Sequence, residues 1–147
     1  DSRKPFEHRI GTFTGADDPG AHDFAAFKTY IDDVLGVDKA APVAMFCTGG
    51  VRCEAASAYM RAAGFAQVYQ LEGGILRYLS ERGSDTATWR GACFVFDDRV
   101  ALTADLQPST HRICPDCGWA IEPDAPPGTD CGCAAQAGQR REIPAAS

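Results

Sequence analysis

Two short apolar runs alternate with two helical patterns across residues 41–83, and this alternation restricts the fold more than any other feature of the chain. The runs APVAMFC (41–47) and QVYQL (67–71) predict buried strands. EAASAYMRAAG and ILRYLSERG predict helices that end at Gly64 and Gly83. A strand–helix–strand–helix order is typical of an α/β domain with a parallel sheet, so we expect that fold class.

Further elements are expected on either side of this unit. Apolar residues recur at helical spacing from Phe24 to Leu35, Asp23 is placed to cap that helix, and Gly36 is placed to end it. The run ACFVFDDRVAL (92–102) predicts one more extended segment.

Bulk composition limits the classes of function. Hydrophobic residues make up 45% of the 147 residues, enough for a core, whereas the net charge of -6 and pI near 4.9 do not favour nucleic-acid binding by bulk attraction. The sequence holds no apolar run long enough for a membrane span, and its charged start, DSRKPFEHR, does not resemble a signal peptide. We therefore expect a cytoplasmic protein without a membrane partner.

The seven cysteines fall into two groups. Cys47, Cys53 and Cys93 lie in the apolar part of the chain, and the other four crowd into its last third. In a reducing cytosol, this distribution favours one reactive thiol region and one metal site over a framework of disulfides.

The first group contains the loop CTGGVR (47–52), in which Cys47 ends a predicted strand and a helix follows. Gly49 and Gly50 let successive N–H groups turn inward, and the helix N-terminus and Arg52 add positive charge. Each of these favours a thiolate, so we expect the pKa of Cys47 to fall and its sulfur to be nucleophilic. The alternative is that Cys47 is a small buried hydrophobe.

This loop resembles the six-residue active-site loop of the rhodanese superfamily, whose first cysteine carries a persulfide. The segments DSR and EHRIGTF resemble the Asp-x-Arg and Glu-x-x-x-Gly elements of that superfamily, and GFAQVYQLEGGILRYL resembles its strand and Gly-Gly segment. Related phosphatase loops are one residue longer, so the shorter ring suits a sulfane sulfur better than a phosphate.

A narrower resemblance rests on CTGGVRCE, LEGGILRYL and CFVFDDRVAL, which are similar to the rhodanese-containing tRNA uridine hydroxylase family. That family, formerly uncharacterised, installs oxygen at C5 of the wobble uridine. Its members have a further domain before the rhodanese domain, and a strand precedes Asp-x-Arg. Both are absent from this chain, so we expect a fragment of a longer protein, or upstream residues that were not observed.

The resemblance also implies roles for individual residues. Cys47 would be the nucleophile or persulfide carrier and Arg52 would close the loop, whose backbone cradle and supporting residues would be Thr48, Gly49, Gly50, Val51, Asp1 and Arg3. Cys53 has either a structural role or a resolving, redox role, and Cys93 is expected in the core.

The second cysteine group predicts a structural zinc site. Cys114 and Cys117 form a CxxC knuckle followed by glycine, and Cys131 and Cys133 supply two more thiolates, with His111 as a candidate substitute. A redox CxxC or an unmetallated segment are the alternatives. We expect a rhodanese-like domain over residues 1–105, a cysteine-rich zinc-binding segment over 106–133 and a flexible tail over 134–147; no organic cofactor is evident.

Three functions follow as hypotheses. The first is an oxidoreductase of the tRNA uridine hydroxylase type that works through Cys47, with tRNA reached through the missing N-terminal domain. The second is a sulfurtransferase that accepts sulfane sulfur from thiosulfate or a protein persulfide. The third is a non-catalytic rhodanese-like binding module, which the presence of both Cys47 and Arg52 disfavours.

Overall fold

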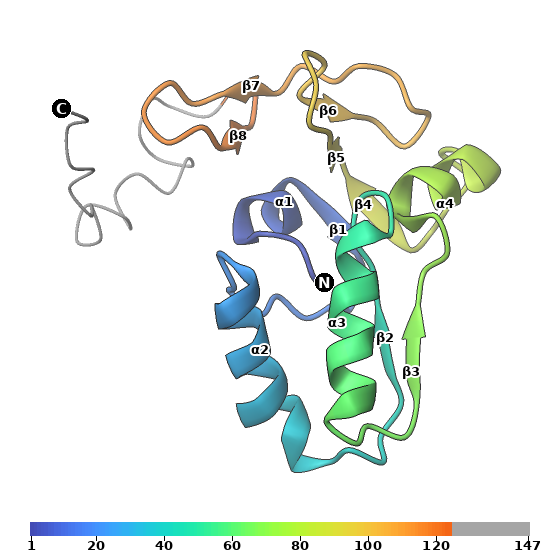
Figure 1. Cartoon of the computed structure of the whole chain (residues 1–147). Helices are drawn as coiled ribbons and strands as arrows, with labels where there is room; N and C mark the ends of the chain where they lie inside the picture. The colour runs from blue at the N-terminus through green and yellow to red at the C-terminus, as the bar shows by residue number, and fades with distance from the viewer. Residues whose placement is uncertain (125–147) are drawn as a thin grey trace, which may run out of the picture.

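The computed structural model describes residues 1–124 (Figure 1). The helices are α1 Pro5–Ile10, α2 Phe24–Asp33, α3 Val51–Ala62 and α4 Gly74–Arg82, with a 3₁₀ turn, η1, at Leu35–Val37. The strands are β1 Gly11–Phe13, β2 Val43–Met45, β3 Val68–Gln70, β4 Trp89–Gly91, β5 Cys93–Phe94, β6 Ala101–Leu102, β7 Arg112–Ile113 and β8 Ala120–Ile121.

The predicted alternation over residues 41–83 is confirmed as β2–α3–β3–α4, and β2 pairs in parallel with β3. Helices α2 and α3 run side by side against this pair (Figure 1). Between them lies the largest group of buried apolar side chains, which includes Ile31 from α2 and Met60 from α3. The chain therefore has an α/β fold in which β2 leads directly into the cysteine loop.

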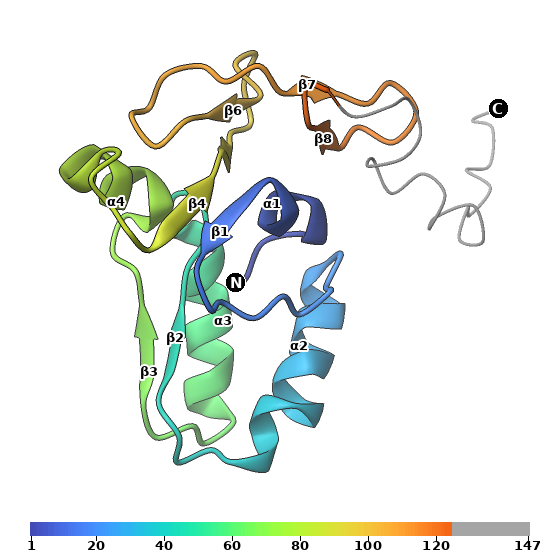
Figure 2. The same ribbon diagram turned by 180° about the vertical axis from the view of Figure 1, so that it is seen from behind.

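The two parallel strands are less buried than their apolar sequences predict. Tyr69 in β3 is 56% exposed, and Ala44 in β2 is exposed as well. Seen from behind, α3 lies on one face of β2 and β3, and no element of residues 1–124 covers the other (Figure 2). The expectation of strands buried on both faces is therefore wrong for the part of the chain described.

Two local expectations about α2 have different outcomes. Asp23 caps the helix as predicted, because its Oδ1 accepts a hydrogen bond from the Ala26 N–H at 2.8 Å. Gly36 does not end the helix directly, since α2 stops at Asp33 and Gly36 lies within the 3₁₀ turn that follows.

The predicted extended segment 92–102 is a hairpin instead. Strands β5 and β6 pair antiparallel with Cys93 opposite Leu102, and the residues between them form a turn. The hairpin, α1 and β8 share a second apolar cluster that contains Phe6, Phe94 and Ala120. Trp119 stacks on Phe6 with 5.5 Å between ring centroids, so the described part of the cysteine-rich segment packs against α1.

Among the described helices, none combines the length and the hydrophobicity that crossing a membrane requires.

Candidate active site

The loop from Cys47 to Arg52 connects the end of β2 to the start of α3. Gly50 has φ of 91°, in the left-handed region that favours glycine, and it directly precedes the first residue of α3. This turn brings the Gly50 N–H within 3.1 Å of the Cys47 sulfur, to which it donates. The loop therefore curls around its own first side chain.

The surroundings of Cys47 favour its ionised form. A hydrogen bond from the Cys53 thiol is the largest influence that lowers the pKa of Cys47, burial opposes it, and backbone N–H groups of Cys53, Arg52 and Gly50 add to the lowering. Together they bring the pKa to about 5. At neutral pH Cys47 is a thiolate, the form that acts as a nucleophile.

Cys53 is the partner thiol of this pair. It lies six positions after Cys47, on the first turn of α3, and is fully buried. Its pKa is raised, first by the hydrogen bond with Cys47 and then by burial, so it keeps its proton and acts as the donor. The Ser2 hydroxyl lies 3.4 Å from the Cys53 sulfur. Cys53 therefore lowers the pKa of Cys47 and favours its thiolate form.

Arg52 forms an ion pair with Glu7, a residue that was not among the candidate site residues predicted from the sequence. Arg52 Nη1 and Nη2 donate to the two oxygens of Glu7 at 2.7 and 2.9 Å, a bidentate pair between α3 and α1. Arg52 Nη2 also donates to the Thr48 hydroxyl at 3.1 Å. Because Glu7 is fully buried, this pairing fixes the guanidinium beside the loop.

Replacing Glu7 with alanine is expected to destabilise the fold by about 2 kcal/mol or more, since it leaves a partly buried guanidinium without its partner. The free energy of unfolding in urea measures this effect. Glu81→Ala is the matched control, because the Glu81–Arg77 pair is exposed and should contribute less than about 1 kcal/mol. Equal losses in the two variants would contradict a structural role for the Glu7–Arg52 pair.

The Gly-Gly segment holds the loop from its outer side. The N–H groups of Ile75 and Leu76 donate to the carbonyls of Cys47 and Thr48 at 3.0 and 3.1 Å. A Cβ on Gly74 would lie 2.5 Å from the Thr48 carbonyl oxygen and 2.7 Å from the Gly50 nitrogen. The carbonyls of Cys47 and Thr48 therefore point toward α4, while the Gly50 N–H points to the sulfur.

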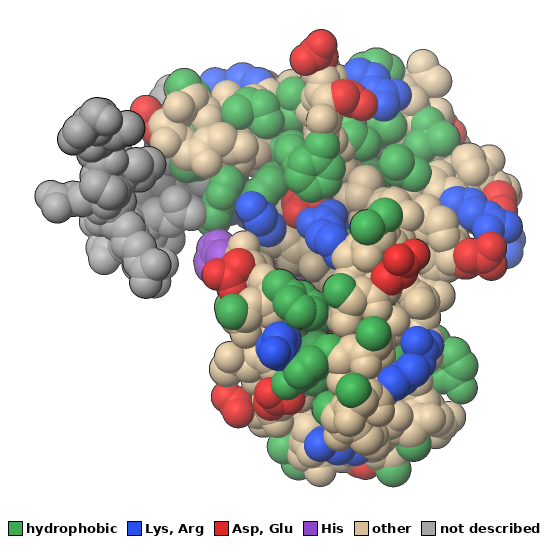
Figure 3. All heavy atoms as spheres, viewed as in Figure 1, with side chains coloured by type: hydrophobic (Ala, Val, Ile, Leu, Met, Phe, Trp, Pro, Cys, Tyr) green, Lys and Arg blue, Asp and Glu red, His purple; other side chains and the backbone are tan. Residues whose placement is uncertain are grey.

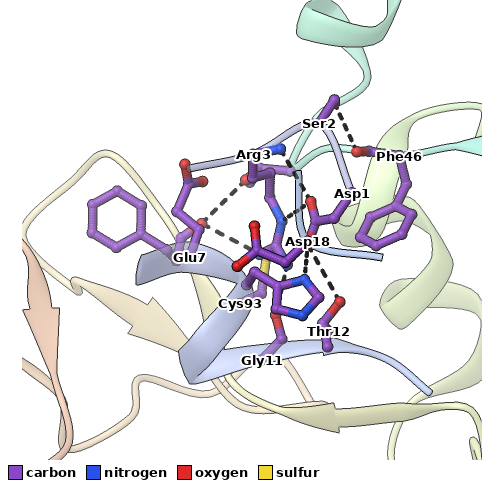
Figure 4. A network of polar contacts seen from close by, with 12 residues as sticks. Asp1, Ser2, Arg3, Glu7, Gly11, Thr12, Asp18, Phe46 and Cys93 are labelled. Carbon is purple, nitrogen blue, oxygen red and sulfur yellow. Dashed lines mark hydrogen bonds and ion pairs between the residues drawn. The ribbon is translucent and has the colours of Figure 1, made fainter. Parts of the chain in front are cut away.

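Asp1 and Arg3 lie beneath the end of β2. Arg3 Nε and Nη2 donate to the Asp1 carboxylate at 2.9 and 2.7 Å, and Nη2 also donates to the Gly11 carbonyl at 2.6 Å. Hydrogen bonds converge on the Asp1 carboxylate, while Ser2 reaches the Phe46 carbonyl (Figure 4). Burial lowers the pKa of Arg3 to about 10, so it stays charged at neutral pH. This network braces the residue that precedes Cys47.

A cavity of about 510 Å³ opens over the loop. Residues of the loop form one wall, and the turn of the β5–β6 hairpin forms the opposite wall. Its lining residues are Cys47, Thr48, Gly49, Val51, Arg52, Leu76, Val95, Phe96, Asp97 and Arg99. The volume lies within the range of about 300–1,000 Å³ that is typical of small-molecule sites. Cys47 belongs to this lining, although its side chain is only 1% exposed.

The other cysteines lie apart from this cavity. Cys93 is fully buried in β5, where burial raises the pKa of its thiol to about 11, so it stays protonated. Cys114 directly follows β7, and Cys117 lies in the turn before β8. Cys131 and Cys133 fall outside the described residues. Within residues 1–124, no three histidine, cysteine or carboxylate side chains gather as a metal site.

The parallel βαβ unit and the cysteine loop at the end of β2 define a rhodanese-type α/β protein. The rhodanese-like domain family matches residues 1–81, more than half of the chain, and the chain belongs to that family.

Several curated proteins that are similar to this chain share the name tRNA uridine(34) hydroxylase. The tRNA uridine(34) hydroxylase of Parasynechococcus marenigrum strain WH8102 is 46% identical over 128 residues, which cover 84% of this chain and 40% of that protein. The proteins of the same name from Synechocystis sp. strain PCC 6803 and Rhizobium etli are both 47% identical, over 82% and 80% of this chain and 44% and 38% of their own lengths. The chain thus spans about two fifths of these relatives.

The structure adds functional candidates that sequence reasoning did not select. Glu7 stood within the Glu-x-x-x-Gly element, but nothing in the local pattern indicated that it binds Arg52. Phe96, Asp97 and Arg99 were assigned to an extended strand, whereas the hairpin turn places them on the cavity wall. Two aspartates beside an arginine within an apolar run were the available signal of a turn.

Proposed function

We propose that this chain is the thiolate-bearing domain of a tRNA uridine(34) hydroxylase. The observation that carries the proposal is that Cys47, whose pKa is lowered to about 5, lines a cavity of about 510 Å³. Support comes from the relatives of that name, which are 46–47% identical to the chain over at least 80% of its length. A tRNA substrate also agrees with the expected cytoplasmic location.

In this proposal Cys47 is the nucleophile, and Arg52 supplies a fixed positive charge beside it. The backbone of Thr48 to Val51 holds the thiolate, and Asp1 and Arg3 act as positioning residues beneath the loop. The net charge of -6 makes this chain a poor binder of the phosphate backbone on its own. The remaining part of the longer protein would therefore supply the basic surface for tRNA.

The test uses the full-length protein in a bacterial strain whose tRNA lacks hydroxyuridine. Expression of the wild-type protein is expected to produce hydroxyuridine at position 34, detected by mass spectrometry of tRNA digests. The Cys47→Ser variant should produce none, while Tyr69→Ala, which alters an exposed residue away from the cavity, should retain the product. Wild-type protein that is folded and forms no hydroxyuridine would refute the proposal.

The second candidate function is sulfur transfer, which the short six-position loop favours. Incubation with thiosulfate would then add the mass of one sulfur atom to the protein, and Cys47→Ala would prevent this gain. A persulfide and sulfur transfer to cyanide, without hydroxyuridine, would identify a sulfurtransferase. If neither a persulfide nor hydroxyuridine is formed, the remaining hypothesis is a non-catalytic binding module.

We further propose that Cys114, Cys117, Cys131 and Cys133 hold a structural zinc ion. The first two lie in a tight turn in which the Gly118 N–H donates to the Cys114 carbonyl at 2.9 Å, and Gly118 has φ of 72°. A hydrogen-bonded turn of this kind lets two thiolates face one metal. His111, the candidate substitute ligand, contacts Ser109 and Glu122 instead.

The full-length protein, purified under reducing conditions, is expected to contain about one equivalent of zinc by elemental analysis. Cys117→Ser should lower the zinc content and the melting temperature, because the metal would stabilise a segment with few apolar residues. Asp116→Asn, which changes the neighbouring side chain and spares the thiolates, should leave both unchanged. A wild-type zinc content far below one equivalent would refute this site.

A further inference from the structure

The wall opposite Cys47 is formed by the turn of the β5–β6 hairpin, which the proposed function leaves without a role. Phe96, Asp97 and Arg99 from this turn line the cavity together with Cys47 and Arg52. Positively charged and hydrophobic side chains lie next to one another at the middle of this face, between the hairpins above and helices α2 and α3 below (Figure 3). The site therefore combines charge with apolar surface.

Phe96 supplies an exposed aromatic surface at this wall. The residue is 74% exposed, although most phenylalanine side chains of the described chain lie in its cores. Its ring lies 5.5 Å from the Arg52 guanidinium carbon and meets the Phe94 ring edge to face, with centroids 5.0 Å apart. The ring is therefore held beside the catalytic loop, with most of its surface unoccupied.

The turn that carries Phe96 has a defined and strained shape. Val100 has φ of 63°, which is unfavourable for a β-branched residue. The Val95 N–H donates to the Val100 carbonyl at 2.9 Å, and the Val100 N–H donates to the Asp97 carbonyl at 3.0 Å. Arg99 and Asp97 form a two-pronged ion pair across the turn. Strain of this kind persists where the surrounding structure enforces it, and it is concentrated at functional sites.

We propose that Phe96 is the stacking surface for the pyrimidine base that is presented to Cys47. This inference rests on the proposed function, and it assigns recognition of the base to the hairpin turn. Bases in single-stranded RNA loops are recognised by splaying them onto aromatic side chains. A small anion such as thiosulfate needs no such surface, whereas a planar base can stack on the part of the ring that Arg52 leaves exposed. Phe96 is thus a specificity residue, and Cys47 remains the reacting group.

The first test measures stacking without relying on the reaction. An anticodon stem-loop RNA that carries a fluorescent base analogue at position 34 is mixed with the full-length protein. Stacking on Phe96 is expected to quench the fluorescence, and Phe96→Ala should remove the quenching, whereas Phe96→Trp should restore it. Tyr69→Ala is the matched control, because Tyr69 is an exposed aromatic residue outside this cavity.

The second test measures the reaction in the strain that lacks hydroxyuridine. Phe96→Ala is expected to reduce hydroxyuridine formation roughly ten- to a hundredfold, the loss that corresponds to one stacked base, and Phe96→Trp should retain most of it. The ionisation of Cys47 should stay unchanged in Phe96→Ala, because Phe96 is not among the groups that shift its pKa. This combination separates recognition of a base from general support of the loop.

The outcomes are distinguishable. Absence of hydroxyuridine with the wild-type protein refutes the proposed function, whatever Phe96 does. Normal hydroxyuridine and normal quenching in Phe96→Ala overturn the stacking role alone. A Phe96→Ala variant that also shifts the titration of Cys47 overturns it as well, because Phe96 would then support the loop rather than the substrate.

Discussion

Titration of the Cys47 thiol in the folded protein is expected to give a midpoint near pH 5. An ordinary cysteine titrates near pH 8.5. The midpoint falls because the Cys53 thiol and the N–H groups of the loop donate to the sulfur, and these bonds outweigh the opposing effect of burial. Any step that needs the thiolate should therefore run at a constant rate from about pH 7 to 9 and fail as the pH drops through 5.

The measurement is the ultraviolet absorbance of the thiolate as a function of pH, taken as the difference between the wild type and Cys47→Ser. This absorbance can be measured without a chemical reagent, which is an advantage because the Cys47 side chain is only 1% exposed. Cys53→Ala should raise the midpoint, because it removes the largest stabilising donor. Cys53→Ser keeps a donor and should preserve a low midpoint. A wild-type midpoint at pH 8.5 or above would overturn the interpretation of this loop.

Replacing Gly74 with alanine is expected to have a large effect on both the stability of the fold and the shape of the cysteine loop. The new Cβ would lie within 2.7 Å of three backbone atoms of the cysteine loop, and Gly74 has φ of 66°. Backbone atoms cannot move aside as a flexible side chain can. The variant should lose stability and also the low midpoint of Cys47, because the loop must shift away from α4.

Gly20→Ala is the control that separates the penalty of the left-handed backbone from the steric clash with the cysteine loop. Gly20 has nearly the same φ, 65°, but nothing lies within 4 Å of its added Cβ. Gly20→Ala should lower the free energy of unfolding by only the backbone penalty of about 1–2 kcal/mol, and the titration midpoint of Cys47 should not change. Gly74→Ala should exceed that loss by about 2 kcal/mol or more in urea unfolding. Equal losses, with the Cys47 midpoint kept near pH 5, would show that α4 does not hold the loop.

Much of the chain's organisation was predictable from local patterns. The strand–helix alternation, the Asp23 cap and the end of α4 at Gly83 are all present, since each depends on residues a few positions apart. The loop CTGGVR also indicated the rhodanese-like family, and the family match confirms that assignment. The exposure of β3 was not predictable, because an apolar run does not show how many neighbours its strand will have.

Local sequence patterns therefore determined the class of fold and the position of Cys47 at the end of β2. Glycines, apolar periodicity and helix caps act over one or two turns of chain. Only the tertiary structure decided what surrounds that cysteine. Glu7 and Arg52 are 45 positions apart and meet because α1 lies beside the start of α3, and Phe96 reaches the cavity because residues 92–102 fold back as a hairpin. Contacts between distant segments depend on how the elements pack, and no pattern within one segment encodes them.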